Sequence, residues 1–352
     1  MSEDIVKDET IKKKVKKDSG VICVGLDCGT MHLVCSRSDT DEVRVTRNVF
    51  LPIDKDDISI NKLTDISYVK TEDDDIFIIG SDAFEFANLF GQTVSRPMER
   101  GLISPKEISA IDVLTLMIKD LIGDTTDKDV YCSYSIPAEA IDEARSVTYH
   151  ENVFARILNN LGVNHTSVNE AMAIIYSECA KEKFSGIGIS FGAGMANVAI
   201  SYKGVEAHTF STARSGDWID KQVAEALAMI PNRVTNVKEK YMKLTGEVTI
   251  KNKKTKRILE ALYYYHKALI EYTVKKIIEE FDEKVDIEMD DEIPIVISGG
   301  TSLPEGFVNL FKSVISNYEL PFEVSEIRAA KNPLSAVANG LLIRTIADVK
   351  GK

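Results

Sequence analysis

Two carboxylates, Asp27 and Glu170, stand where an acidic side chain could take part in phosphate chemistry. Asp27 ends an apolar run with strand character. A carboxylate there is costly unless it has a partner, and a magnesium ion with its waters would be such a partner. Glu170 begins a helical run, from which it could orient or deprotonate a water attacking a terminal phosphoryl group. A glutamate at a helix N-terminus also stabilises the helix dipole, so its position alone leaves both roles open.

Glycine-bearing turns follow two apolar runs, one in each half of the chain. Each turn is followed by a second apolar run, a pattern that predicts a β-hairpin. Glycine lets the backbone turn sharply and bring its N–H groups against an anion. We therefore predict that the two turns grip phosphates from both sides of a two-lobed protein. Their residues are Gly29, Thr30, Met31 and His32 in the first turn, and Gly192, Ala193, Gly194 and Met195 in the second.

A third glycine motif follows the apolar run 293–298. A double glycine there would let a nucleoside lie against bare backbone, and the helix expected after it would direct its N-terminus at negative charge. We expect this motif to bind the nucleoside through Gly299, Gly300, Thr301 and Ser302.

Alternating strand and helix signals predict an α/β architecture in which these motifs are held at strand ends. The predicted strands are 21–27, 31–37, 43–50, 75–79, 129–136, 186–191, 196–203 and 293–298. A capping box at 104–107 opens a helix that Gly123 can end. Further helices are predicted over 138–161 and about 255–281.

Composition narrows the classes of function. With 352 residues, about two domains are expected. The formal net charge of -12 argues against a nucleic-acid surface, and no apolar run approaches the roughly 20 residues needed to cross a bilayer. The five cysteines form no C-x-x-C pair and are expected to be small buried hydrophobes. Residues 1–19 are predicted to be a disordered basic tail, with weak contact to an anionic surface as the alternative.

The order of the motifs resembles the actin, hexokinase and heat-shock chaperone ATPase superfamily over about residues 20–345. The resemblance is closest to the bacterial MreB branch, with magnetosome-type MamK proteins as near relatives. The segments that carry it are 27–30, 96–103, 136–137, 170–173, 216–220, 298–301 and 332–337 with Gly340. It implies an actin-like, duplicated RNase H-like, two-lobed ATPase fold in which each lobe is a core domain with a smaller subdomain.

The resemblance also implies a division of the chain. The first lobe would span 20–160, with a small subdomain inserted at about 46–95, and a C-terminal helix at 333–348 would return to it. The second lobe would span 161–332, with a helical subdomain inserted at about 212–275.

The resemblance implies that ATP and Mg²⁺ bind between the lobes. Asp27 would hold Mg²⁺ through water, Glu170 would position the attacking water, and Gly216, Asp217 and Lys238 would join the nucleotide-binding residues. Two positions depart from the family pattern. Ser190 replaces an aspartate, which puts the rate of hydrolysis in doubt. Thr235 replaces a base-binding glutamate, which puts nucleotide selectivity in doubt.

The implied function is that of an actin-like cytoskeletal protein in the cytoplasm. It would polymerise head to tail, with slow ATP hydrolysis regulating assembly. Its partners would be further copies of itself and accessory filament-binding proteins, without direct nucleic-acid binding and with at most weak membrane contact. The alternatives are a non-filamentous, nucleotide-gated, chaperone-like regulator and a small-molecule kinase of the same fold.

Overall fold

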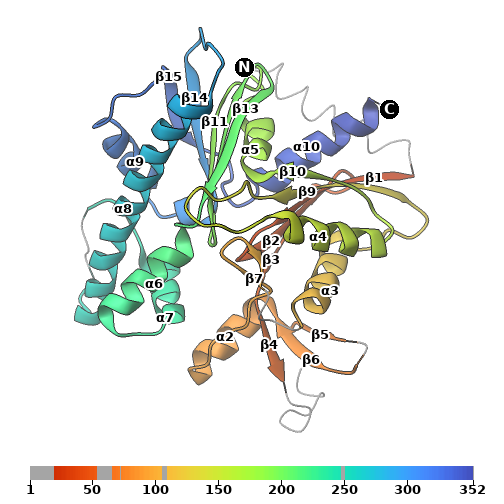
Figure 1. Ribbon diagram of the computed structural model, residues 1–352. Coiled ribbons are helices and arrows are strands. Elements are labelled where there is room, and N and C mark those ends of the chain that lie inside the picture. The colour runs from red at the N-terminus through yellow and green to blue at the C-terminus, as the bar shows by residue number, and fades with distance from the viewer. Residues whose placement is uncertain (1–19, 54–65, 72, 105–108, 247–249, 352) are drawn as a thin grey trace.

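Each half of the protein is built around a five-stranded sheet (Figure 1). The computed structural model describes residues 20–53, 66–71, 73–104, 109–246 and 250–351. The first sheet has the order β10-β9-β1-β2-β3, and the second has the order β13-β12-β11-β14-β15. In both sheets the central strand pairs antiparallel with the strand that follows it in the chain and parallel with a later strand. The two sheets thus repeat one arrangement, as predicted for a duplicated α/β fold.

The first half contains its sheet, a two-stranded hairpin, two helices and a small subdomain. The sheet strands are β1 (Val21–Cys28), β2 (His32–Arg37), β3 (Val43–Arg47), β9 (Asp129–Ile136) and β10 (Asn164–Asn169). The hairpin and helices are β7 (Met98–Glu99), β8 (Leu102–Ile103), α3 (Ala110–Ile122) and α4 (Thr148–Asn160). The small subdomain consists of β4 (Phe50–Ile53), β5 (Tyr68–Lys70), β6 (Ile76–Ile79) and α2 (Gly80–Phe90).

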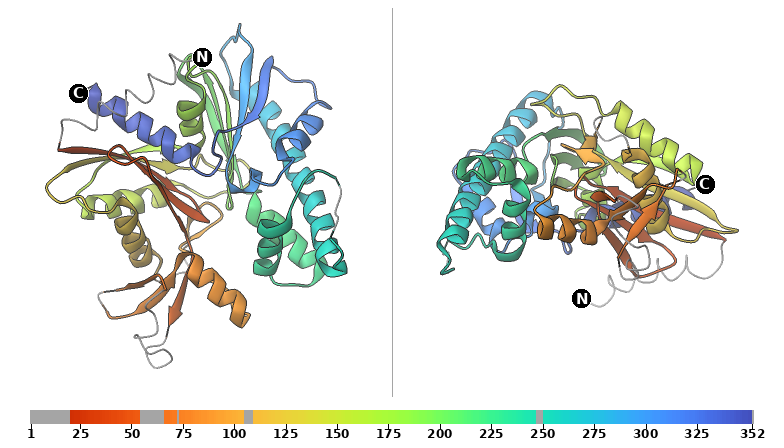
Figure 2. Two further views of the ribbon diagram at one scale, coloured as in Figure 1. Left: turned by 180° about the vertical axis from the view of Figure 1, so that it is seen from behind. Right: turned by 90° about the horizontal axis from the view of Figure 1, so that it is seen from below.

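The second half combines its sheet with a helical subdomain, which lies at the same end of the molecule as the small subdomain (Figures 1 and 2). The strands are β11 (Gly186–Phe191), β12 (Ala196–Tyr202), β13 (Val205–Thr212), β14 (Ile293–Ser298) and β15 (Val324–Ala329). The short 3₁₀ helix η2 (Gly300–Ser302) and α9 (Phe307–Ile315) follow β14. The helical subdomain consists of α6 (Gly216–Leu227), α7 (Pro231–Tyr241) and the start of α8 (Lys253–Lys284).

Helices α5 (Glu170–Glu178) and α10 (Ala336–Lys350) lie between the sheets (Figure 1). They cross at backbone contact, since a Cβ on Gly340 would overlap the carbonyl oxygen of Ala173. A Cβ on Gly25 of β1 would likewise overlap the carbonyl oxygen of Ala338 in α10. On the other sheet, a Cβ on Gly188 of β11 would crowd α5. Glycine is therefore required where each connecting helix meets its sheet and its partner helix.

Each half has its own hydrophobic core, and continuously buried strands such as β11, β12 and β14 run through the second core. All five cysteines are buried and free, which confirms their predicted role as small hydrophobes. Within the part of the chain that the structure describes, no helix combines the length and hydropathy needed to cross a bilayer.

Most predicted strands are present within a residue or two of their expected bounds, but two predicted elements needed correction. The strand expected over 43–50 divides into β3 and β4, which belong to different sheets. It divides next to Asn48, whose buried amide donates a hydrogen bond of 3.0 Å to the carbonyl oxygen of Gly29. The helix expected over 138–161 begins only at Thr148, so the prediction for 138–147 was wrong. That segment instead runs beside β13, where Ile141 N–H donates to the carbonyl oxygen of Ser211 (3.0 Å).

Sheet membership refines the expected division of the chain. β10 pairs with β9, so residues 164–169 belong to the first sheet although the second lobe was expected to start at 161. The limit expected at about 275 falls inside α8, which continues unbroken to Lys284. The predicted tail 1–19 and residues 105–107 of the capping box lie outside the described residues. The helix after that box is α3, and Gly123 follows it with a positive φ of 72°, as predicted.

Candidate functional site

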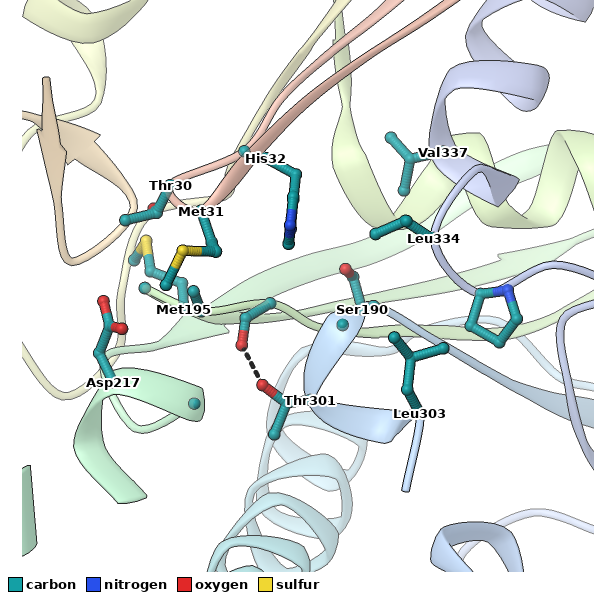
Figure 3. A pocket seen from close by; sticks show the side chains of 18 of the residues that line it. Thr30, Met31, His32, Ser190, Met195, Asp217, Thr301, Leu303, Leu334 and Val337 are labelled. Carbon is teal, nitrogen blue, oxygen red and sulfur yellow. Dashed lines mark hydrogen bonds between the residues drawn. The ribbon is translucent and has the colours of Figure 1, made fainter. Parts of the chain in front are cut away.

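A cavity of about 470 Å³ lies between the two halves, within the size range of small-molecule sites (Figure 3). Its walls are the β1–β2 and β11–β12 turns, the first residues of α5 and α6, part of α7, η2 with the loop after it, and the start of α10. Both halves of the chain therefore contribute to one cavity.

The two hairpin turns present unused backbone donors. Among the described residues, no group accepts a hydrogen bond from the backbone N–H of Gly29, Thr30, Met31, Ala193 or Gly194. All five residues line the cavity. Clustered backbone N–H groups in a glycine turn form a concave site for an anion. The arrangement therefore suits a phosphate group approached from both sides.

The turns also contact each other across the two halves. A Cβ on Gly194 would overlap the backbone nitrogen of Gly101 and the hydroxyl of Thr30. That nitrogen donates a hydrogen bond of 3.1 Å to Thr30 Oγ1. In the first turn, a Cβ on Gly29 would lie 2.5 Å from the carbonyl oxygen of His32. Glycine at 29 thus lets the first turn close tightly on itself, and glycine at 194 lets the second turn pack closely against the first half.

Asp27 and Glu170 form a half-buried pair of carboxylates that line the cavity. Asp27 Oδ1 accepts a hydrogen bond from Ser135 Oγ at 2.9 Å. Glu170 Oε1 accepts from Ser190 Oγ at 2.5 Å, and its Oε2 accepts from Asn197 Nδ2 at 2.9 Å. Ser190 and Asn197 stand directly opposite each other in the β11–β12 ladder. One cross-strand pair therefore holds both oxygens of the glutamate.

Burial raises the pKa of Asp27 and of Glu170 above the ordinary carboxyl value, and the charge of Asp27 raises the pKa of Glu170 further. The hydroxyl donors Ser135 and Ser190 act in the opposite direction. No basic side chain among the described residues forms an ion pair with either carboxylate. Two crowded carboxylates without a cation fit a magnesium ion, which is commonly held by one or two carboxylates together with substrate phosphates.

The second turn is fixed to the helical subdomain through one carbonyl oxygen. Gly192 O accepts hydrogen bonds from Gly216 N (3.1 Å), Ser215 Oγ (2.6 Å) and Thr301 Oγ1 (2.7 Å; Figure 3). Asp217 lines the cavity, but both its carboxylate oxygens are held at 2.8 Å by Arg96 of the first half. The side chain of Asp217 thus bridges the two halves.

Comparisons with known proteins agree with this arrangement. The family model described as Volactin matches residues 22–345. The chain belongs to the Volactin family. No curated protein matches it.

Solved structures share the fold of this Volactin-family chain at low sequence identity. A MamK double helical filament has a TM-score of 0.71 and 17% identity over 94% of this chain and 99% of that chain. MreB 5 of Spiroplasma citri bound to AMPPNP has a TM-score of 0.67 and 14% identity, covering 95% and 98%. Apo psk41 ParM has a TM-score of 0.56 and 15% identity, covering 95% and 99%. The predicted actin-like, duplicated RNase H-like fold is thereby confirmed.

Among the residues that the structure describes, three arginine and lysine side chains line the cavity of this Volactin-family protein, and each is paired with a carboxylate. They form the pairs Lys238–Asp220 (2.8 Å), Arg47–Glu239 (2.8 Å) and Lys243–Glu305 (2.7 Å). Asp220 also accepts a hydrogen bond of 2.6 Å from Thr235, and burial raises its pKa although Lys238 and Thr235 lower it. The expected nucleotide ligand Lys238 is therefore already engaged within its own lobe.

The structure brings the predicted site residues of this Volactin-family protein together, with one exception. Ser302 does not line the cavity, and its hydroxyl donates to Gly299 O within its own turn (2.8 Å). The sequence reading missed Ser135, Asn197 and Arg47. Asn197 could have been found by counting back from the second turn, because hairpin pairing places it opposite Ser190. No comparable signal marked Arg47, which reaches the cavity from β3.

Proposed function

We propose that this protein binds ATP with Mg²⁺ between its lobes, hydrolyses it slowly and assembles head to tail into filaments. One observation carries the proposal. Two glycine turns with unused N–H groups converge on a cavity that also contains two carboxylates, and no basic side chain among the described residues pairs with either of them. Structures with this fold include MreB 5 bound to AMPPNP and a MamK filament, which supports nucleotide binding and filament assembly in the proposal.

In this proposal the two turns hold the phosphates through the N–H groups of residues 29–31 and 193–194. Asp27 contacts the hydration shell of the magnesium ion, which neutralises phosphate charge when it is bound. Gly299 and Gly300 lie against the nucleoside in this proposal. A Cβ at Gly300 would project into open space beside the cavity wall, whereas Gly299 has a φ of 91° and a Cβ there would overlap the backbone of Phe191. Lys238 and Thr235, joined through Asp220, form the wall expected beside the sugar or base.

Glu170 is the proposed general base. Each of its oxygens accepts one hydrogen bond from the Ser190–Asn197 pair, and each retains lone-pair capacity for a water. The carboxylate takes a proton as the water oxygen bonds to the γ-phosphorus. The bond between that phosphorus and the bridging oxygen breaks, which yields ADP and inorganic phosphate. A raised pKa makes Glu170 a better proton acceptor than an ordinary glutamate once it is ionised.

Assembly would follow from nucleotide contacts that join the two lobes. A ligand held by both turns favours one relative position of the lobes. If that position presents head and tail surfaces that match, heterologous contacts propagate as a filament instead of closing into a ring. The proposal places the protein in a cytoskeleton, with further copies of itself and accessory filament-binding proteins as its partners.

Nucleotide binding is tested by isothermal titration calorimetry with ATP and Mg²⁺. The blocked variant is Gly300→Val, and the matched control is Gly20→Val. At both positions an added Cβ meets nothing within 4 Å, and neither glycine has a positive φ. We expect the wild type and Gly20→Val to bind and Gly300→Val to lose binding. A folded wild type that gives no binding heat with ATP or GTP would overturn the proposal.

Assembly and hydrolysis are tested by electron microscopy and phosphate release with ATP, with ADP and without nucleotide. We expect filaments that depend on ATP and phosphate release that slows strongly in Glu170→Gln. A protein that binds ATP but stays monomeric at high concentration would favour the non-filamentous regulator. Transfer of phosphate to a small molecule would favour the kinase.

A further inference from the structure

The charge balance of the cavity is unusual for a polyphosphate site. Asp27, Glu170, Asp217, Asp220, Glu239 and Glu305 line it. The arginine and lysine side chains of the described lining are each neutralised by one of these acids, as shown above. The protein therefore offers an anionic ligand no unpaired permanent cation in the part of the cavity that the structure describes. The cavity must therefore gain positive charge when an anionic ligand binds.

His32 is the remaining basic side chain in the lining. It is the last residue of the first turn and the first residue of β2, and its ring points into the cavity between Met31 and Val337 (Figure 3). The ring is half-buried, and no group among the described residues forms a hydrogen bond with it. Its two nitrogens are therefore available to a ligand held by the turn.

The charged groups that act on His32 come from three neighbouring elements. Arg47 stands directly opposite in the β2–β3 ladder, Arg96 lies in the segment before β7, and Glu239 belongs to α7. Burial and the two arginines lower the pKa of His32 to about 4, against the smaller opposing effect of Glu239. The imidazole is thus neutral at pH 7 while the cavity is empty.

A bound phosphate would act on the pKa of His32 in the opposite direction and raise it. A unit negative charge about 4 Å away, at an effective dielectric constant of about 20, raises the pKa of an imidazole by about three units. A triphosphate carries several such charges, and Mg²⁺ neutralises part of them. The expected pKa of His32 in the complex therefore reaches or exceeds neutral pH.

We propose that His32 takes a proton from solvent as the nucleotide enters and binds a phosphate oxygen as an imidazolium. One N–H bond forms on the ring, and no other covalent bond changes. This inference depends on the proposed nucleotide binding and adds a proton to it. Nucleotide affinity then rises as pH falls from about 8 to about 6, because proton uptake accompanies binding.

The Asp27–Glu170 pair also exchanges protons, so its contribution must be separated. A cation that binds these carboxylates displaces protons, whereas His32 takes one up. Comparison of the wild type with His32→Asn isolates the histidine, because the carboxylates are the same in both proteins. His165→Asn is the matched control, since His165 lies in β10, outside the cavity lining.

The first experiment is calorimetric titration with ADP and with AMPPNP, each with Mg²⁺, in buffers of different ionisation enthalpy. Near pH 6 we expect the wild type and His165→Asn to take up about one proton more than His32→Asn. We expect His32→Asn to bind about tenfold more weakly and with a flatter pH dependence. Equal proton uptake in all three proteins would overturn the inference while leaving nucleotide binding intact. No binding by a folded wild type would instead overturn the proposed function.

The second experiment reads the histidine directly. The chain has five histidines, so the ring carbon–proton signals of labelled protein can be assigned with the His32→Asn variant. We expect the His32 signal to titrate near pH 4 in the free protein and about three units higher or more with AMPPNP. The His165 signal should move little. A His32 signal that stays neutral at pH 6 in the nucleotide complex would overturn the inference.

Discussion

The cross-strand pair that holds Glu170 gives the sharpest test of its role as a base. Asn197→Ala removes the amide that donates to Glu170 Oε2 at 2.9 Å. It also removes the acceptor that Ala138 N–H uses at 3.3 Å. The donor from Ser190 remains, so the glutamate keeps one of its two partners. The substitution therefore weakens the hold on the ionised carboxylate without removing the carboxylate itself.

The size of the effect follows from the kind of hydrogen bond that is lost. A hydrogen bond to a charged group is worth about 1.5–3 kcal/mol, which corresponds to about one to two pKa units. Since the lost donor favours the ionised form, the pKa of Glu170 rises by that amount above its already raised value. Below the new pKa, the ionised fraction falls about 10- to 100-fold. Phosphate release at neutral pH should fall in the same proportion.

The assay is the pH dependence of phosphate release at saturating ATP and Mg²⁺. Asn197→Ala should move the rising limb of the profile about one to two units toward alkaline pH, so that its rate recovers at high pH. Ser201→Ala is the control, since Ser201 is buried on the same strand and donates instead to Phe184 O at 2.8 Å. An Asn197→Ala profile that keeps the wild-type midpoint would refute the assignment of Glu170 as the ionising group.

Three further predictions concern stability and closure of the lobes. Because the cavity carboxylates have raised pKa values, the native state binds more protons than the unfolded state, so its unfolding free energy should fall as pH rises from about 6 to about 8. In urea titrations, Mg²⁺ should restore more of the unfolding free energy at the higher pH. Glu170→Gln should reduce the change in unfolding free energy over this pH range by roughly 1–2 kcal/mol. A wild type whose unfolding free energy rises toward pH 8 would contradict this prediction. Gly340→Ala should lower the unfolding free energy by about 3 kcal/mol or more, because the added Cβ overlaps α5. The control Gly300→Ala should change it by no more than about 0.5 kcal/mol. Equal urea midpoints for the two variants would argue against backbone contact where α5 and α10 cross. Arg47→Glu should weaken nucleotide binding, measured by calorimetry, about fivefold or more. Adding Glu239→Arg should recover at least part of the lost affinity. If affinity does not recover, the ion pair does not hold the lobes together.

Most helices and strands could be predicted from the sequence because the patterns that indicate them are local. Apolar runs such as 186–191 and 293–298 stay buried on both faces, and buried strands have a simple pattern in sequence. The segment 138–147 was misread as helix because its conformation depends on hydrogen bonds to Ser211 and Ala213, distant in sequence. No local pattern encodes such contacts. β10 was missed for a similar reason: with its polar sequence it is a strand through its pairing with β9.

The parts of the site that depend on backbone conformation could be predicted from the sequence. The parts that depend on ion pairs between distant residues could not. A glycine turn can be recognised from the sequence, and so can a carboxylate that ends an apolar strand. The neutralisation of Lys238 by Asp220 required the packing of α6 against α7, and that of Arg47 by Glu239 required contact between two subdomains. Sequence therefore located the cavity but not its charge balance.

The backbone crossing of α5 and α10 limits how the molecule can deform. With no side chain between Gly340 and the neighbouring helix, the two helices cannot slide far without a steric collision. A rotation of one half against the other that keeps this contact would pivot close to it. Displacement grows with distance from a pivot, so a rotation that shifts the nearby phosphate turns slightly moves the outlying α2 and α7 much further (Figure 1). In the proposed filament, a change of a few tenths of an ångström around a bound phosphate would thus alter, by a larger amount, the surface that one subunit presents to the next.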